Sequence, residues 1–139
     1  MSRREEIAVS GAAMSQAPWA AAGAAGAVVT GGDLVLHLMT AHLGLASSLS
    51  AGAVAFVAVA AGGAVLSARS GRAMRWARQN PWRFAVAPGI ACAMIVFVLS
   101  IVSGGGMIGG AFTALWHGAV AYGLTGAAAS MAGGRKRTT

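Results

Sequence analysis

The chain has 139 residues, of which 57% are hydrophobic and only 9% are charged, and its formal net charge is +7. Soluble domains carry about 25% charged residues, so this chain lacks the polar side chains that would cover its surface in water. The composition excludes most soluble folds and nearly all disordered chains, and it favours an integral membrane protein. The single cysteine, Cys92, excludes a disulfide within the chain and a cysteine-rich zinc site.

Residues 1–18 form a mildly polar segment, in which Ser2-Arg3-Arg4-Glu5 matches a capping box and indicates a short helix. A secretory signal peptide is the alternative for this segment. Glu5 and Glu6 oppose its basic start, and polar residues interrupt its apolar core. We therefore expect residues 1–18 to remain as a cytoplasmic N-terminal segment.

Four apolar stretches follow, each long enough to cross a bilayer as a helix of about 20 residues. They are Trp19–Leu38, Leu49–Ala68, Phe84–Ser103 and Met107–Ala132. Pro18 and the dipeptide Asn80-Pro81 are typical of helix starts. Trp19 and Trp82 suit the membrane interface. The sequence thus predicts an all-α fold in which residues 19–132 form a four-helix membrane bundle.

Every arginine and lysine lies in the N-terminal segment, in a middle loop of residues 69–83 or in a tail of residues 133–139. The basic residues of the loop and the tail are Arg69, Arg72, Arg75, Arg78, Arg83, Arg135, Lys136 and Arg137. With four spans these segments share one side of the membrane, and short positive loops stay in the cytoplasm. We therefore expect a multi-pass protein of the inner (cytoplasmic) membrane with both termini in the cytoplasm.

A weaker pattern recurs 63 residues along the chain, where Pro18-Trp19 is matched by Pro81-Trp82. Each half then consists of Pro-Trp, a helix, an outer turn, a second helix and Gly-Arg. This order is typical of a parallel repeat about an axis along the membrane normal. Chance matches are frequent in alanine-rich sequences, so the pattern allows two tandem helical hairpins without establishing a duplication.

Polar residues inside the predicted spans are the candidates for a functional site. Thr30, Asp33 and His37 are spaced three and four residues apart and share one helix face. On the fourth span, Thr113 and His117 are one turn apart, at a depth similar to that of Asp33. A buried aspartate costs several kcal/mol unless it is paired or protonated, so we expect a contact between Asp33 and His117. This contact would be a proton or cation relay or a structural polar clamp; alternatively, water reaches Asp33 from the outer side.

The arginines of the middle loop, interleaved with Trp76 and Trp82, suit anionic lipid headgroups at about 1 kcal/mol each. The alternative is contact with nucleic acid phosphates or an acidic protein surface. Small residues at helical spacing on the fourth span, among them Ala114, Gly118 and Ala121, favour close packing within the chain or in a homo-oligomer. No phosphate loop, metalloprotease or nucleophile-elbow pattern occurs, so we expect no enzyme, cofactor or metal.

Two segments carry a resemblance to a known family, namely RWARQNPWRF at residues 75–84 and LWHG at residues 115–118. With its hydrophobic layout and its alanine, glycine and arginine bias, about three quarters of the chain resembles the small hydrophobic spread proteins of conjugative plasmids in high-GC Gram-positive bacteria. The resemblance implies a non-enzymatic membrane component that aids plasmid spread beside a DNA translocase. The alternatives are a small transporter or channel that uses Asp33 and His117, and a holin-like pore.

Overall fold

The computed structural model of the chain describes residues 17–40, 44–66 and 72–134, together with Arg4, Glu5, Ala8, Ala12 and Ser15. Residues 19–134 contain five helices, and no strand is present among the described residues. The helices are α2 (Trp19–Met39), α3 (Leu45–Leu66), α4 (Arg72–Gln79), α5 (Pro81–Val102) and α6 (Met107–Gly134). The expected all-α class is confirmed.

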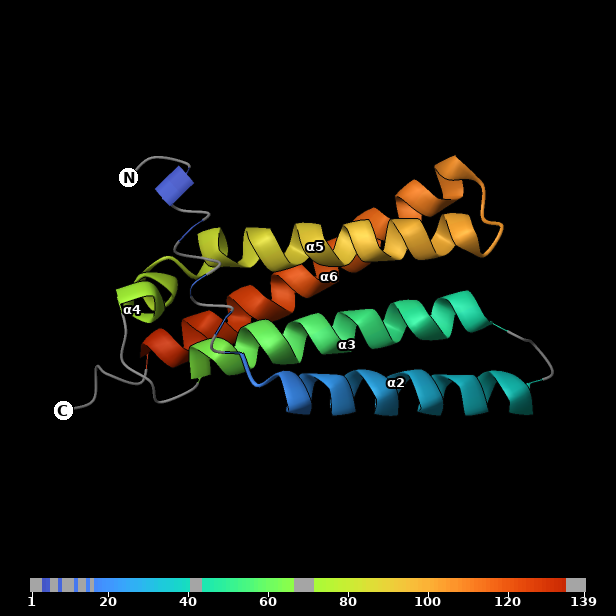
Figure 1. Cartoon of the computed structure of the whole chain (residues 1–139), viewed down its shortest axis with the longest axis horizontal. Helices are drawn as coiled ribbons and strands as arrows, with labels where there is room; N and C mark the ends of the chain where they lie inside the picture. Colours follow the sequence, from blue (N-terminus) through green and yellow to red (C-terminus); the bar gives the residue numbers. More distant parts are fainter. Residues whose placement is uncertain are drawn as a thin grey trace.

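The four long helices form two helical hairpins that run in the same direction (Figure 1). α2 packs antiparallel to α3, and α5 packs antiparallel to α6. Both hairpins turn at the same end of the molecule, which we call the turn end. The short helix α4 lies at the opposite end, the α4 end, where it contacts α3, α5 and α6.

α3 is the central helix, because it contacts α2, α5 and α6. α2 contacts α3 and none of the other helices given above. It lies at the edge of the assembly, and only its residues Ala22 and Gly26 are buried. A bundle in which each helix has two long neighbours is therefore not confirmed; the hairpins meet through α3.

The distribution of side-chain sizes is the reverse of that in a soluble protein. Most of the buried hydrophobic residues are alanines, whereas large apolar side chains point outward on all four long helices. Val28 in α2, Val102 in α5 and Phe112 in α6 are 72%, 80% and 72% exposed. Soluble monomers rarely expose apolar surface on this scale, and small residues at helix contacts are typical of membrane helices. The fold is compatible with a membrane protein.

Three of the helices, α2, α3 and α5, are long and apolar enough to cross a membrane. α6 is the longest helix, with 28 residues, but it is not among these three. It contains seven glycines in addition to threonine, serine and histidine residues, and these lower its hydropathy.

Two predicted boundaries differ from the structure. α3 begins at Leu45 rather than at residue 49, since Ser47 and Ser48 belong to its first turn, where both hydroxyls donate hydrogen bonds to the carbonyl oxygen of Gly44 (2.7 and 3.1 Å). Much of the predicted basic loop is helical, because residues 72–79 form α4. Packing stabilises this short helix: Met74 and Ala77 are buried against the ends of the long helices.

Candidate functional site

Asp33 is the single acidic residue of the five helices, and it lies at the interface of α2 and α3. Its Oδ2 atom accepts a 2.7 Å hydrogen bond from the hydroxyl of Ser48 and lies 3.2 Å from Nδ1 of His37. The side chains of Asp33 and His37 are 32% and 31% exposed. The predicted proximity of Asp33 and His37 on one helix face is thus seen, and Ser48 joins them from α3.

The hydrogen bonds around His37 indicate which of its ring nitrogens carries the proton. Nδ1 lies 2.8 Å from the backbone oxygen of Asp33, in addition to the carboxylate oxygen. Both neighbours are acceptors, so the hydrogen-bond network assigns the proton to Nδ1 in the neutral ring. Nε2 is then the proton acceptor, and it lies 3.4 Å from the hydroxyl oxygen of Ser47. Asp33, His37 and Ser47 therefore form one continuous chain of polar contacts.

Thr30 lies one turn farther from the turn end, where it meets the backbone of α3. A Cβ atom added to Gly52 would overlap the hydroxyl of Thr30 and would lie 2.9 Å from the carbonyl oxygen of Gly26. The two helices touch at this crossing without room for a side chain. The polar contacts of the α2–α3 interface are therefore closed off on the side that faces the α4 end.

His117 and Thr113 form a separate pair on α6. Nδ1 of His117 lies 2.7 Å from the carbonyl oxygen of Thr113, and the Thr113 hydroxyl donates to the carbonyl oxygen of Gly109. The predicted contact between Asp33 and His117 is wrong, because α2 and α6 do not touch and each side chain has its own partners. Depth along a helix was predicted from residue number, but residue number does not determine which helices are neighbours.

The contacts inside the two hairpins correspond pair by pair. Trp19 at the start of α2 packs on Phe56 of α3, with ring centroids 6.0 Å apart. Trp82 at the start of α5 packs on Tyr122 of α6, with centroids 5.5 Å apart. The first members of these pairs are 63 residues apart, and the second members are 66 residues apart. The offset of 63 therefore relates α2 to α5, whereas α3 and α6 correspond at 66.

The glycine crossings follow the same two offsets. A Cβ atom on Gly26 would lie 3.2 Å from the carbonyl oxygen of Gly52, and one on Gly89 would lie 3.2 Å from the carbonyl oxygen of Gly118. Because aromatic pairs and glycine crossings both recur at these offsets, the hairpins share one packing scheme.

The same offsets also hold near the turn end. A Cβ atom on Gly44 would meet the ring of His37, and one on Gly110 would meet the side chain of Ser100. Gly110 and Ser100 are therefore the counterparts of Gly44 and His37. The correspondence thus extends over the length of the hairpins.

The basic α4 end is built on a helix with two different sides. Met74 and Ala77 are buried, while Arg72 and Arg75 are exposed. Arg78 points back toward the protein and donates two hydrogen bonds, from Nε (3.1 Å) and Nη2 (2.8 Å), to the carbonyl oxygen of Val65. This carbonyl belongs to the last turn of α3, where helix carbonyls lack partners within the helix. Arg78 thus caps α3.

The remaining predicted basic residues fall into two groups. Arg83 is exposed in the first turn of α5, close to the α4 end. Arg69, Arg135, Lys136 and Arg137 lie outside the described residues. The structure therefore tests the basic surface only at α4 and at the start of α5.

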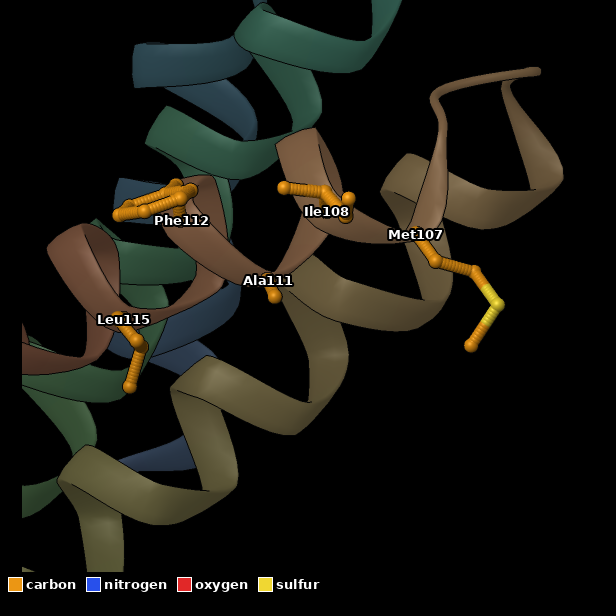
Figure 2. Close-up of a pocket in the computed structure, with 5 residues that line it drawn as sticks. All are labelled: Met107, Ile108, Ala111, Phe112 and Leu115. Carbon is orange, nitrogen blue, oxygen red and sulfur yellow. The ribbon is translucent and has the colours of Figure 1, made fainter.

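A shallow hollow of about 300 Å³ lies on the outer surface of α6 near the turn end (Figure 2). Its lining is entirely apolar: Met107, Ile108, Ala111, Phe112 and Leu115. A surface without polar groups to orient a ligand suits lipid chains better than a specific small molecule. Within the described part of the chain, no three His, Cys, Asp or Glu side chains are arranged to hold a metal ion.

The chain matches no protein-family model, and comparisons with curated proteins and with solved structures give no significant match.

Proposed function

We propose that the chain is a multi-pass protein of the cytoplasmic membrane, in which α2, α3, α5 and α6 all cross the bilayer. The observation that carries this proposal is the outward placement of large apolar side chains on every long helix, while small residues make the helix contacts. A crossing by α6 is supported by its 28 residues, which span about 42 Å against a hydrocarbon core of about 30 Å. Its exposed Ile108, Phe112 and Leu115 suit lipid.

We place the α4 end in the cytoplasm. Arg72, Arg75 and Arg83 are exposed at this end, whereas residues 40–44 and 103–106, which connect the helices at the turn end, contain no arginine or lysine. Short loops rich in arginine stay in the cytoplasm during insertion. An even number of crossings then puts both termini in the cytoplasm.

We infer that the exposed side of α4 is the contact surface of the protein. Met74 and Ala77 fix the helix against the long helices, so Arg72 and Arg75 are held at the membrane surface rather than on a free loop. Arginines at this level attract anionic lipid headgroups at about 1 kcal/mol each. The same surface suits an acidic or phosphate-bearing partner.

The process that we propose for this contact surface is plasmid spread between cells, beside a membrane-associated DNA translocase. Its support is the resemblance of residues 75–84 and 115–118 to spread proteins. The test combines Arg72→Glu and Arg75→Glu in the chain encoded on a conjugative plasmid, with Gln79→Glu, an exposed α4 position, as the matched control. We expect plasmid spread to fall while carbonate-resistant membrane insertion is unchanged. Undiminished spread in the double variant would remove the interaction role.

A further inference from the structure

The polar residues at the turn end of the first hairpin are not required by its packing. Offsets of 63 and 66 place Asp33 and Ser48 where the second hairpin has Val96 and Ala114. Val96 is fully buried and Ala114 is 5% exposed, and both belong to an apolar cluster. The second hairpin thus closes with the same aromatic pair and glycine crossing but without an acid. The repeat serves as an internal control: hairpin formation does not explain Asp33.

We propose that Ser47 is a nucleophile activated by His37 and Asp33, which gives the turn end an acyl-transfer site for carboxylic esters. This activity goes beyond the proposed contact surface at α4 and departs from the expectation of a non-enzymatic protein. It depends on neither the plasmid process nor the orientation of the chain in the membrane.

The geometry assigns a role to each side chain of the site. The carboxylate of Asp33 and the backbone oxygen of the same residue hold the proton on Nδ1 of His37 (3.2 and 2.8 Å). Nε2 is left as a base, 3.4 Å from Oγ of Ser47. This order of atoms is that of a Ser-His-Asp relay, and such contacts are often looser before substrate binds. Ser48 is a positioning residue, because its 2.7 Å hydrogen bond orients the carboxylate.

The hydroxyl of Ser47 needs only a small change to become reactive. It donates to the carbonyl oxygen of Gly44 at 2.7 Å, and rotation about the Cβ–Oγ bond turns its proton toward Nε2 without moving a heavy atom. Ser47 is exposed in the first turn of α3. Backbone N–H groups of a first helical turn have no acceptor within the helix, so Leu45 and Ala46 are placed to stabilise a developing oxyanion.

The reaction balances with water as the only co-reactant. Oγ of Ser47 forms a bond to the ester carbonyl carbon as its proton passes to Nε2 of His37. The bond to the ester oxygen then breaks, and Nε2 returns the proton to the leaving alkoxide. Water attacks the acyl-serine by the same proton transfers, which releases the carboxylic acid and restores the Ser47 hydroxyl. Asp33 remains ionised throughout and stabilises the imidazolium.

Access to this site is from the turn end. Ser47 is exposed, and Asp33 and His37 are each about one third exposed. On the other side, the crossing of Gly26 and Gly52 closes the interface. An ester at the membrane surface can therefore reach Ser47, whereas no described polar group continues the path toward the α4 end.

The test uses the full chain in detergent and a fluorophosphonate probe, which reacts covalently with activated serines. We expect the probe to label the wild type, with the mass increase mapped to Ser47. Ser47→Ala should abolish labelling, and His37→Ala should slow it by about 100-fold or more. The matched control is Thr113→Ala in the second hairpin, at the position that corresponds to Ser47 by the offset of 66. Its labelling should equal that of the wild type.

Asp33 acts through His37, so its test uses a conservative rescue. Asp33→Asn should slow labelling by about 100-fold, and Asp33→Glu, which keeps the charge, should recover part of this loss. Ser48→Ala should slow labelling several-fold. Thermal unfolding checks that each variant is folded. An unlabelled wild type, labelling that survives Ser47→Ala, or labelling insensitive to His37→Ala in a folded chain would each overturn the proposal.

Discussion

Gly26 of α2 and Gly52 of α3 approach each other so closely that neither position has room for a side chain. A Cβ atom on Gly26 would lie 3.2 Å from the Gly52 carbonyl oxygen, and one on Gly52 would lie 2.9 Å from the Gly26 carbonyl oxygen. Close backbone approach is how helices associate where the hydrophobic effect does not drive them together. Since α2 contacts only α3 among the long helices, this crossing is a principal attachment of the edge helix.

Replacement of Gly52 by alanine should loosen the first hairpin. The added methyl group would overlap the Thr30 hydroxyl, and forcing the helices apart should lower the free energy of unfolding by about 1–3 kcal/mol. Gly23→Ala is the matched control, because a Cβ atom there meets nothing within 4 Å. Alanine favours the helix by up to about 1 kcal/mol over glycine, so the control should be neutral or stabilising. Denaturant titration in detergent compares both, and equal effects would contradict the crossing.

The residues of the second hairpin should substitute for the polar pair of the first. The double variant Asp33→Val with Ser48→Ala recreates the Val96–Ala114 pair, and we expect its free energy of unfolding to stay within about 1 kcal/mol of the wild type. Ser48→Ala alone removes the hydroxyl donor from the carboxylate and should cost about 1–3 kcal/mol. A double-mutant cycle by thermal or chemical unfolding measures the coupling. Failure of the double variant to fold would show that the hairpins are not equivalent at this level.

Arg78 should contribute more to stability than its exposed neighbour. Arg78→Met removes both hydrogen bonds to the carbonyl oxygen of Val65, and charged hydrogen bonds contribute about 1.5–3 kcal/mol. Arg75→Met changes an exposed side chain and should alter stability by no more than about 0.5 kcal/mol. Hydrogen exchange at the end of α3 should also increase in the Arg78 variant alone. Indistinguishable unfolding of the two variants would argue against the cap.

Much of the fold could be predicted because apolar length and helix-start residues are local signals. Trp19 begins α2 as predicted, and Pro81 begins α5 after Asn80. α4 was missed because its eight residues are too short for a periodic pattern. Its helicity depends on burial of Met74 and Ala77 beneath the long helices, which is a tertiary effect.

The candidate site could be predicted only on its α2 side. The spacing of Asp33 and His37 predicts their proximity, because residues four apart lie on one helix face. Ser47 and Ser48 join them only because the α2–α3 crossing fixes the register of the neighbouring helix, and sequence spacing within one helix does not contain that register. The contact with His117 failed for the same reason, since depth is set by residue number but helix neighbours are set by packing.

The most direct test of the account is the sidedness of three positions in a Cys92→Ala background. Single cysteines replace Gln79 before α5, Ser103 after α5 and Gly134 at the end of α6, and intact cells are treated with a membrane-impermeant maleimide. Four crossings predict labelling at Ser103 from outside, while Gln79 and Gly134 react only after the membrane is opened. Labelling of Gly134 from the same side as Ser103 would show that α6 does not cross. Labelling of Gln79 and Ser103 from one side would contradict the membrane arrangement altogether.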